Sequence, residues 1–274
     1  MSLFAKESYA IDHYNCARLD FDTLVKYVPC VESANFDQFE CMLIETSKKW
    51  KEDNLKASWF KVPLKYSSFI PILVKNGFVY HHARTEFVMM LKWFSDGVYN
   101  IPNYAFTNIG VGGIVLDEND HVLVVKERHN FGKPFWKFPG GFANPREEFG
   151  DTAEREVFEE TGIKTKFQSL IVLRHSDKSQ FECSDIYILC SLKPVKDENN
   201  PNLETKMCAQ ELTDIAWIPA KELKPHLSPF NLFAFEKFLS YREKKIIIGL
   251  DKVDSVFKQF GKQSVYSIKF EEQQ

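Results

Sequence analysis

The sequence has little of what marks a disulfide-stapled, zinc-binding or membrane-spanning protein. Its 6 cysteines are scattered over 274 residues, with no CxxC pair and no histidine at zinc-ligand spacing from them. No run approaches the ~20 apolar residues that span a bilayer, and the N-terminal stretch has no sustained apolar segment. We therefore expect reduced thiols, no membrane partner and a soluble protein of the cytoplasm, with the nucleus and the mitochondrion left open.

An excess of positive charge is also missing. The formal net charge is -3, so a surface that wraps nucleic acid as a whole has no electrostatic support, and we expect no nucleic-acid partner. Apolar material, in contrast, is abundant. Hydrophobic residues make up 44% of the chain and include 25 Phe, which is enough for ordered cores. At this length, two domains are the default expectation.

The first hundred residues predict an α+β domain. Apolar residues recur at near-helical spacing from Phe36 to Trp50, and Asn35 or Asp37 can cap the start of this helix. Strand-like runs and one further helix, which stops at Gly77, follow at 57–64, 67–76, 78–84 and 87–94. The order strand, helix, strand, strand is typical of a small sheet covered by helices.

Turn-forming residues around Pro102 indicate where the two domains meet. The segment 96–106 has no apolar period and is the predicted linker between a domain at 1–95 and a second domain at 107–245, followed by a C-terminal extension at 246–274. The second domain opens with two β-rich runs separated by turn formers at 118–120, which indicates a hairpin. Further strands and a closing helix are predicted at 166–175, 184–192, 212–219 and 229–242.

One segment of the second domain carries the chemistry. From Gly141 to Ile163 the chain reads GFANPREEFGDTAEREVFEETGI. At 100° per residue, Glu156, Glu159 and Glu160 fall within about one quadrant of a predicted helix. Like charges at these spacings repel one another, so the cluster indicates a bound cation. Hard oxygen ligands of this kind select Mg²⁺, with Mn²⁺ as the alternative.

A solvated acidic helix face is the simpler interpretation of such a segment. It explains neither Arg155, which is placed to pair with Glu147 in the preceding loop, nor the adjacent glycines Gly140 and Gly141, which let backbone approach a ligand or metal closely. The segment resembles the signature of the Nudix hydrolase superfamily. Every fixed position of that signature is occupied, by Gly141, Glu147, Arg155, Glu156, Val157, Glu159, Glu160, Gly162 and Ile163.

This resemblance implies both a fold and a reaction. The fold is an α/β/α sandwich around a mixed sheet, and the reaction is attack by a metal-activated water on a diphosphate linked to another group. The implied metal ligands are the carbonyl of Gly140 and the carboxylates of Glu156, Glu159 and Glu160. The implied supporting pair is formed by Glu147 and Arg155.

Other site residues follow less directly from the sequence. The general base is either a glutamate of the signature, such as Glu159, or a carboxylate on a downstream loop, for which Glu211 is the candidate. Lys126 and Arg128, after the second strand, are candidates for phosphate contacts because their charge suits an anionic substrate. Trp136 either stacks on a base or packs in the core, as large aromatic residues often do.

Resemblance extends beyond the signature. WKFPGGF and SDIYILCSLKP in the second domain, and Trp59, Gly77-Phe78 and His81-His82-Ala83 in the first, resemble the Nudix group with an N-terminal "pre-Nudix" domain. That group includes the vertebrate antisense basic-fibroblast-growth-factor Nudix proteins and the plant ADP-ribose/NADH pyrophosphatases. The resemblance implies an acetyltransferase-like fold for residues 1–95.

We expect the first domain to be non-catalytic. It has no Gly-rich turn that could cradle a pyrophosphate at a helix start, so homodimer contacts or covering of the substrate pocket are its expected roles. His81 and His82 are adjacent strand residues, which point to opposite faces, and so we expect no catalytic pair there.

The sequence thus predicts Mg²⁺-dependent hydrolysis of a nucleoside diphosphate linked to another moiety, with a nucleotide-type small molecule as substrate. The group resemblance favours ADP-ribose or NADH, although the NADH-type motif SQPWPFPxS and a proline soon after the signature are both missing. Two alternatives stay open: a nucleotide-sensing or partner-binding regulatory module, and an RNA cap hydrolase.

Overall fold

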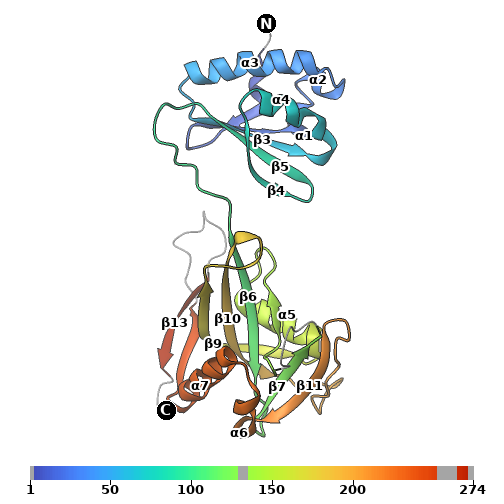
Figure 1. Ribbon diagram of the computed structural model, residues 1–274, viewed down its shortest axis with the longest axis vertical. Coiled ribbons are helices and arrows are strands. Elements are labelled where there is room, and N and C mark those ends of the chain that lie inside the picture. The colour runs from blue at the N-terminus through green and yellow to red at the C-terminus, as the bar shows by residue number, and fades with distance from the viewer. Residues whose placement is uncertain (1–2, 129–134, 252–263, 271–274) are drawn as a thin grey trace. The chain divides into compact units, whose positions relative to one another are not determined.

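The chain consists of two compact units. The computed structural model describes residues 3–128, 135–251 and 264–270, and the units are Met1–Ala105 and Phe106–Gln274 (Figure 1). The boundary falls at the end of the segment 96–106. Residues 252–263 and 271–274 of the predicted C-terminal extension lie outside the described residues.

The first unit is a five-stranded mixed sheet with helices on one side (Figure 1). The strand order is β1-β2-β3-β5-β4, and the pairing of β2 with β3 is parallel while the others are antiparallel. The strands are β1 (Tyr9–Ile11), β2 (Cys16–Asp20), β3 (Ala57–Pro63), β4 (Val79–Arg84) and β5 (Phe87–Trp93). The helices are η1 (Lys6–Ser8), α1 (Phe21–Leu24), α2 (Pro29–Glu32), α3 (Phe36–Glu52), η2 (Leu64–Phe69) and α4 (Ile70–Lys75).

Helix α3 confirms the helix predicted from apolar spacing. The side chain of Asn35 accepts a hydrogen bond from the backbone N–H of Gln38 at 3.1 Å, which satisfies one of the free donors of the first turn. Phe39 and Trp50 on its inner face pack in one core with Phe60 of β3. The helix therefore forms because its apolar stripe has an aromatic sheet face to cover.

The second unit contains a six-stranded mixed sheet and a separate two-stranded sheet. The larger has the order β13-β12-β9-β10-β6-β8, in which only β10 and β6 are parallel, and the smaller pairs β11 with β7. The strands are β6 (Thr107–Val115), β7 (His121–Glu127), β8 (Gly140–Phe142), β9 (Thr165–Ser176), β10 (Ser184–Pro194), β11 (Leu212–Pro219), β12 (Ile246–Asp251) and β13 (Val265–Phe270). The helices are α5 (Phe149–Thr161), η3 (Gln180–Glu182), α6 (Ala220–Leu223), η4 (Lys224–His226) and α7 (Pro229–Glu243).

Helices cover both faces of the larger sheet. Ile114 of β6 packs in one core with Phe235 of α7, whereas the next residue, Val115, packs in another core with Val157 of α5. Because successive strand residues point to opposite faces, α5 and α7 lie on opposite sides. This arrangement agrees with the expected α/β/α sandwich around a mixed sheet. The acetyltransferase-like fold of the first unit stays a prediction.

The predicted hairpin at the start of the second unit is wrong. Strands β6 and β7 share only the isolated bridge Leu116–Val122 among the described pairings, and β7 pairs with β11 instead. Both edges of β6 are already occupied, one by β10 and the other by β8. A strand has two edges, so none is left for β7, and β8 is too short to be recognised from sequence.

The two adjacent histidines do not point to opposite faces as expected, although their non-catalytic role stays a prediction. The register of β4 against β5 shifts between Tyr80 and His82, which is a β-bulge at His81. The bulge breaks the alternation of side chains, and the two Nδ1 atoms of His81 and His82 come within 2.7 Å of each other. Contact between these imidazoles follows from a backbone irregularity that residue spacing does not reveal.

Candidate active site

Helix α5 positions the glutamates of the signature. It begins at Phe149 and ends at Gly162, whose φ of 73° lies in the left-handed region that favours glycine. Ala153 and Val157 face the sheet and are fully buried. Glu160, one turn after Val157, is only 4% exposed, whereas Glu159 beside it is exposed. The same helix thus presents one carboxylate to solvent and another to the interior.

Arg155 ties the carboxylates together. Its guanidinium donates two hydrogen bonds to Glu147, at 2.7 and 2.8 Å, and one each to Glu156 at 2.6 Å and Glu159 at 3.0 Å. It also donates to the carbonyl of Phe142 at 3.1 Å. The hydrogen bonds from Arg155 lower the pKa of Glu147 to about 2, so this carboxylate stays charged at any working pH.

Burial has the opposite effect on Glu160. Loss of solvent raises its pKa to about 7, although Lys137 at 4.0 Å and a 3.0 Å hydrogen bond from the N–H of Gly140 favour the charged form. Burial also raises the pKa of Glu156. The negative charge of Glu211, the residue before β11, adds to both increases, and its role as the base stays a prediction.

The paired glycines let backbone reach the carboxylates. A Cβ atom on Gly140 would collide with the backbone of Val111 and Gly112 in β6. A Cβ atom on Gly141 would lie 2.5 Å from Oε2 of Glu156. Any larger residue would therefore push β8 away from β6 or from α5.

These residues fit a hard divalent cation. Within the described residues, no three acidic, histidine or cysteine side chains converge closely enough to hold an ion, and Arg155 pairs with both Glu156 and Glu159. The donor set is nevertheless the one that Mg²⁺ prefers, since it consists of carboxylate and carbonyl oxygens. The buried charge of Glu160 has no cation closer than 4.0 Å among the described side chains, and a bound ion would supply one.

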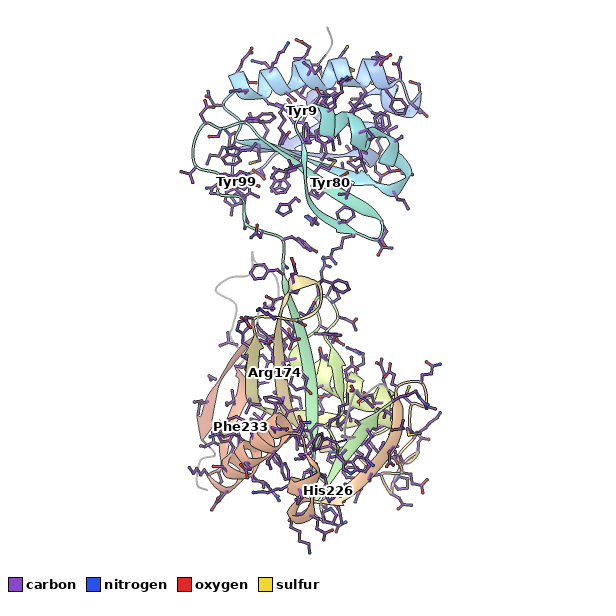
Figure 2. The ribbon with its side chains drawn as sticks, in the orientation of Figure 1. Tyr9, Tyr80, Tyr99, Arg174, His226 and Phe233 are labelled. Atoms are coloured by element: carbon purple, nitrogen blue, oxygen red, sulfur yellow. The ribbon has the colours of Figure 1, made fainter. Side chains whose placement is uncertain are left out.

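A cleft of about 390 Å³ lies beside the glycines. Lys137 and Arg174 line it, together with the aromatic rings of Tyr187 and Phe230. The guanidinium carbon of Arg174 lies 4.9 Å from the ring centre of Phe230 and 5.4 Å from that of Tyr187, and Nη2 donates to Asp185 at 2.9 Å. Figure 2 labels Arg174 on the second unit. Two cations and an aromatic wall therefore face the same space, and each cation is paired with a carboxylate that also lines the cleft, Glu127 or Asp185.

Three predicted substrate contacts do not line this cleft. Lys126 pairs with Asp214 at 2.9 Å and lies over the ring of Trp136 at 4.0 Å. Trp136 packs against the core beneath α7, which favours the packing alternative for this residue. Arg128 donates to the carbonyl of Ala209 at 2.7 Å. Their roles in substrate binding stay predictions.

Two cleft residues were missed by reasoning from the sequence. Lys137 lies only three residues before Gly140, where its charge next to the signature was a usable signal, and it also pairs with Glu127. Arg174 lies near the end of an ordinary strand pattern, and only the pairing of β9 with β10 places it at the cleft.

The fold and this site define a class of protein: an α/β/α sandwich in which a glutamate-rich helix lies next to a cleft lined by charged and aromatic residues. A family model described as the NUDIX domain matches residues 107–237, and a second, described as the Nudix hydrolase domain, matches residues 8–94. The chain belongs to the Nudix hydrolase family, a family of enzymes.

Relatives of known name support this membership. The human protein "Nucleoside diphosphate-linked moiety X motif 6" is 35% identical over 76% of this chain and 64% of its own length. The Xenopus laevis protein of the same name is 41% identical over 57% of this chain and 70% of its own length. "Nudix hydrolase 7" of Arabidopsis thaliana is 34% identical over 72% of this chain and 73% of its own length. The chain thus spans less than two thirds of the human relative. No helix in the described part of the chain is long and apolar enough to cross a membrane.

Proposed function

We propose that this chain hydrolyses a nucleoside diphosphate linked to another moiety, with ADP-ribose or NADH as the substrate class. The observation that carries the proposal is the buried carboxylate of Glu160, 4% exposed and with its pKa raised to about 7, beside a cleft lined by two cations. Burying a carboxylate costs stability unless a partner compensates for it. A bound divalent cation would provide that compensation, and the same ion would attract the phosphoryl oxygens of the substrate.

Enzymes of this family generally use divalent metal ions. Glu156, Glu159, Glu160 and the carbonyl of Gly140 would hold Mg²⁺, or Mn²⁺ in its place. A bound ion would lower the pKa of a water and neutralise charge on the phosphoryl oxygens. Arg155 keeps Glu147, Glu156 and Glu159 near one another, and Glu156 and Glu159 would shift from this pairing to share an ion.

The chain's own residues supply the remaining functions. The carboxylate of Glu211 accepts the proton of the attacking water, with Glu159 as the alternative base. Lys137 and Arg174 offset the charge of the diphosphate in the cleft, and the ring of Phe230 offers a surface for the attached moiety. Gly140 lines the cleft and its N–H donates to Glu160, so an ion held by that carboxylate would lie beside the diphosphate, and water would attack phosphorus and not a sugar carbon.

Turnover in ¹⁸O-labelled water tests the reaction. With ADP-ribose and Mg²⁺, we expect AMP and ribose 5-phosphate, with the label in one of the phosphates and no turnover in EDTA. Label on a ribose carbon, or undiminished turnover in EDTA, contradicts the proposal. A panel of ADP-ribose, NADH, coenzyme A, dinucleoside polyphosphates and capped RNA ranks the substrates. Absence of turnover on every compound would favour a regulatory module instead.

For the first unit, we propose a non-catalytic role that includes homodimer contacts. Its residues contain two glycines, Gly77 and Gly97, and neither precedes a described helix as a phosphate cradle would require. Light scattering of the full chain at several concentrations measures the assembly. A mass that stays monomeric up to high micromolar concentration would rule out the homodimer.

A further inference from the structure

The face of the first sheet that points away from the helices carries its own apolar cluster. Cys16, Trp59 and Leu91 are buried there, although they alternate with residues that face α3. What covers them is the segment 98–105, which has no regular secondary structure. Tyr99 of this segment, labelled in Figure 2, packs edge-on against Trp93 at 5.4 Å between ring centres. An irregular segment covers an extended sheet face less completely than a helix does.

A cavity of about 390 Å³ remains between the sheet and this segment. Its walls are mainly aromatic, because Trp59, Trp93, Tyr14, Tyr104 and His81 all line it. Pockets for small ligands usually measure about 300 to 1,000 Å³ and combine apolar walls with a few polar groups. The cavity therefore has the size and the walls of a small-molecule site, and it lies entirely within the first unit.

Two cations border the cavity, and the residues described as lining it include no carboxylate. The guanidinium of Arg18 lies 4.4 Å over the ring of Trp59, and its Nε donates to Asp12 at 2.7 Å. Lys56 is exposed and has no ion pair within the described part of the chain. An unpaired ammonium beside aromatic walls favours a ligand that is both flat and negatively charged.

The histidine pair fixes one wall of the cavity. His81 contacts the carbonyl of Pro102 through Nε2 at 3.0 Å, and the ring of His82 stacks on Tyr104 at 4.2 Å with an interplanar angle of 6°. The bulge in β4 that brings the two imidazoles together thus anchors the covering segment at two points. A cavity that is held open in this way requires little rearrangement to accept a ligand.

We propose that this cavity binds a small aromatic anion of mononucleotide size, with its ring against Trp59 and Trp93 and its negative group near Lys56 and Arg18. The site is separate from the carboxylate cluster of the second unit, and the proposal goes beyond hydrolysis. No chemistry is implied, because the lining groups include no activated nucleophile: burial raises the pKa of the Cys16 thiol and keeps it protonated.

Fluorescence titration of the full chain with 1-anilinonaphthalene-8-sulfonate, in EDTA, tests the proposal. This probe combines aromatic rings with a sulfonate, and EDTA removes any contribution from metal at the other site. We expect saturable binding that Lys56→Gln weakens at least about fivefold. Lys26→Gln is the matched control, since Lys26 is an exposed lysine of the same unit that does not line the cavity.

A second variant and two competitors complete the experiment. Ile101→Trp should fill the cavity and abolish binding without lowering the melting temperature, because Ile101 lines it and is partly exposed. AMP should displace the probe, whereas ribose 5-phosphate, which lacks a ring, should not. The proposal is overturned if AMP and ribose 5-phosphate displace the probe equally, or if neither displaces it. It is also overturned if Lys56→Gln and Ile101→Trp bind the probe as tightly as the wild type. Loss of hydrolysis in Glu160→Gln would leave this result unaffected.

Discussion

Helices α3 and α5 lie on mixed sheets in different units and bury different kinds of residue. The inner face of α3 is formed by Phe39, Leu43 and Trp50, and its buried polar atoms are neutral: two hydroxyl groups and the indole N–H of Trp50. The inner face of α5 includes Val157 in a similar role, but it also buries the carboxylate of Glu160. One helix is placed by packing alone, whereas the other carries a charge into the interior.

The charges on the outer faces differ in the same way. On α3, charges of opposite sign pair at helical spacing, as in Lys49–Asp53 at 2.6 Å and Lys48–Glu45 at 2.8 Å. On α5, one arginine is shared among three carboxylates from α5 and its preceding loop. A helix under selection for stability alone has no need for this excess of negative charge. The difference shows where the chain gives up stability to keep a chemical group in place.

Removal of the buried charge should have the largest effect on turnover. We expect Glu160→Gln to lower kcat by more than about 1,000-fold, because one anionic ligand of the proposed Mg²⁺ site is lost while the side-chain shape is kept. Steady-state kinetics with ADP-ribose at saturating Mg²⁺ measure this loss.

Asp151→Asn is the control for that variant. Asp151 lies on the first turn of α5, exposed and away from Gly140, so its loss should change kcat by less than about threefold. Wild-type turnover in Glu160→Gln would show that the metal assignment is wrong and that α5 is as purely structural as α3.

Local sequence patterns predicted the helices better than the strand pairing. The cap at Asn35 and the glycine stop at Gly77 depend on neighbouring residues, and the structure has them as expected. The partner of β7 depends instead on which edges of β6 are already filled, and one of those edges is filled by β10, a strand far away in the sequence. Spacing alone does not contain that information.

The same limit applies to the candidate site. Glu147, Arg155 and Glu156 lie within one short segment, and Arg155 donates hydrogen bonds to both carboxylates. Glu160 lies on the same helix, but its carboxylate accepts a hydrogen bond from the N–H of Gly140 instead. Arg174 and Phe230 come from β9 and α7, and only tertiary packing places them together. The contact between His81 and His82 depends on a bulge, and no residue in that strand signals it.

Removal of the largest residue from the inner face of α3 should affect stability and not turnover. Trp50 is 1% exposed and packs edge-on against Phe4 and Tyr9. We expect Trp50→Ala to lower the free energy of unfolding of the first unit by about 3 to 5 kcal/mol. Hydrogen exchange of α3 measures the change, and kcat should stay within about twofold. A large loss of kcat would mean that α3 contributes to the reaction.

The stability of the metal-free protein should respond to Glu160 in a pH-dependent way. The pKa of Glu160 is about 7 in the folded state, above the ordinary glutamate value of 4.5, so folding takes up a proton between these pH values. Its contribution is fully present below pH 4.5 and is lost as the pH rises through 7. We therefore expect Glu160→Gln to be up to roughly 3 kcal/mol more stable than the wild type at about pH 8, and equally stable near pH 4.

Urea unfolding in EDTA at several pH values measures this difference. Asp151→Asn, whose carboxylate is exposed, should show no comparable gain at alkaline pH. If Glu160→Gln and the wild type are equally stable both near pH 4 and at about pH 8, burial of the Glu160 carboxylate does not lower the free energy of unfolding. The proposed contrast between α5 and α3 would then disappear.

The smallest effects are expected from two neighbouring hydroxyl groups on α3, and they should have opposite signs. Thr46 Oγ1 accepts a buried hydrogen bond from the N–H of Phe4 at 2.9 Å, whereas Ser47 Oγ is buried without a partner among the described residues. Thr46→Val leaves a buried donor unsatisfied and should cost about 1 to 2 kcal/mol. Ser47→Ala removes an unsatisfied group and adds the better helix former, so it should stabilise by roughly 0.5 kcal/mol. If thermal unfolding shows these two changes in stability and kcat is unchanged, both residues serve only the packing of α3. If Ser47→Ala instead lowered kcat, a buried polar group on α3 would be retained for function, as we infer for Glu160 on α5.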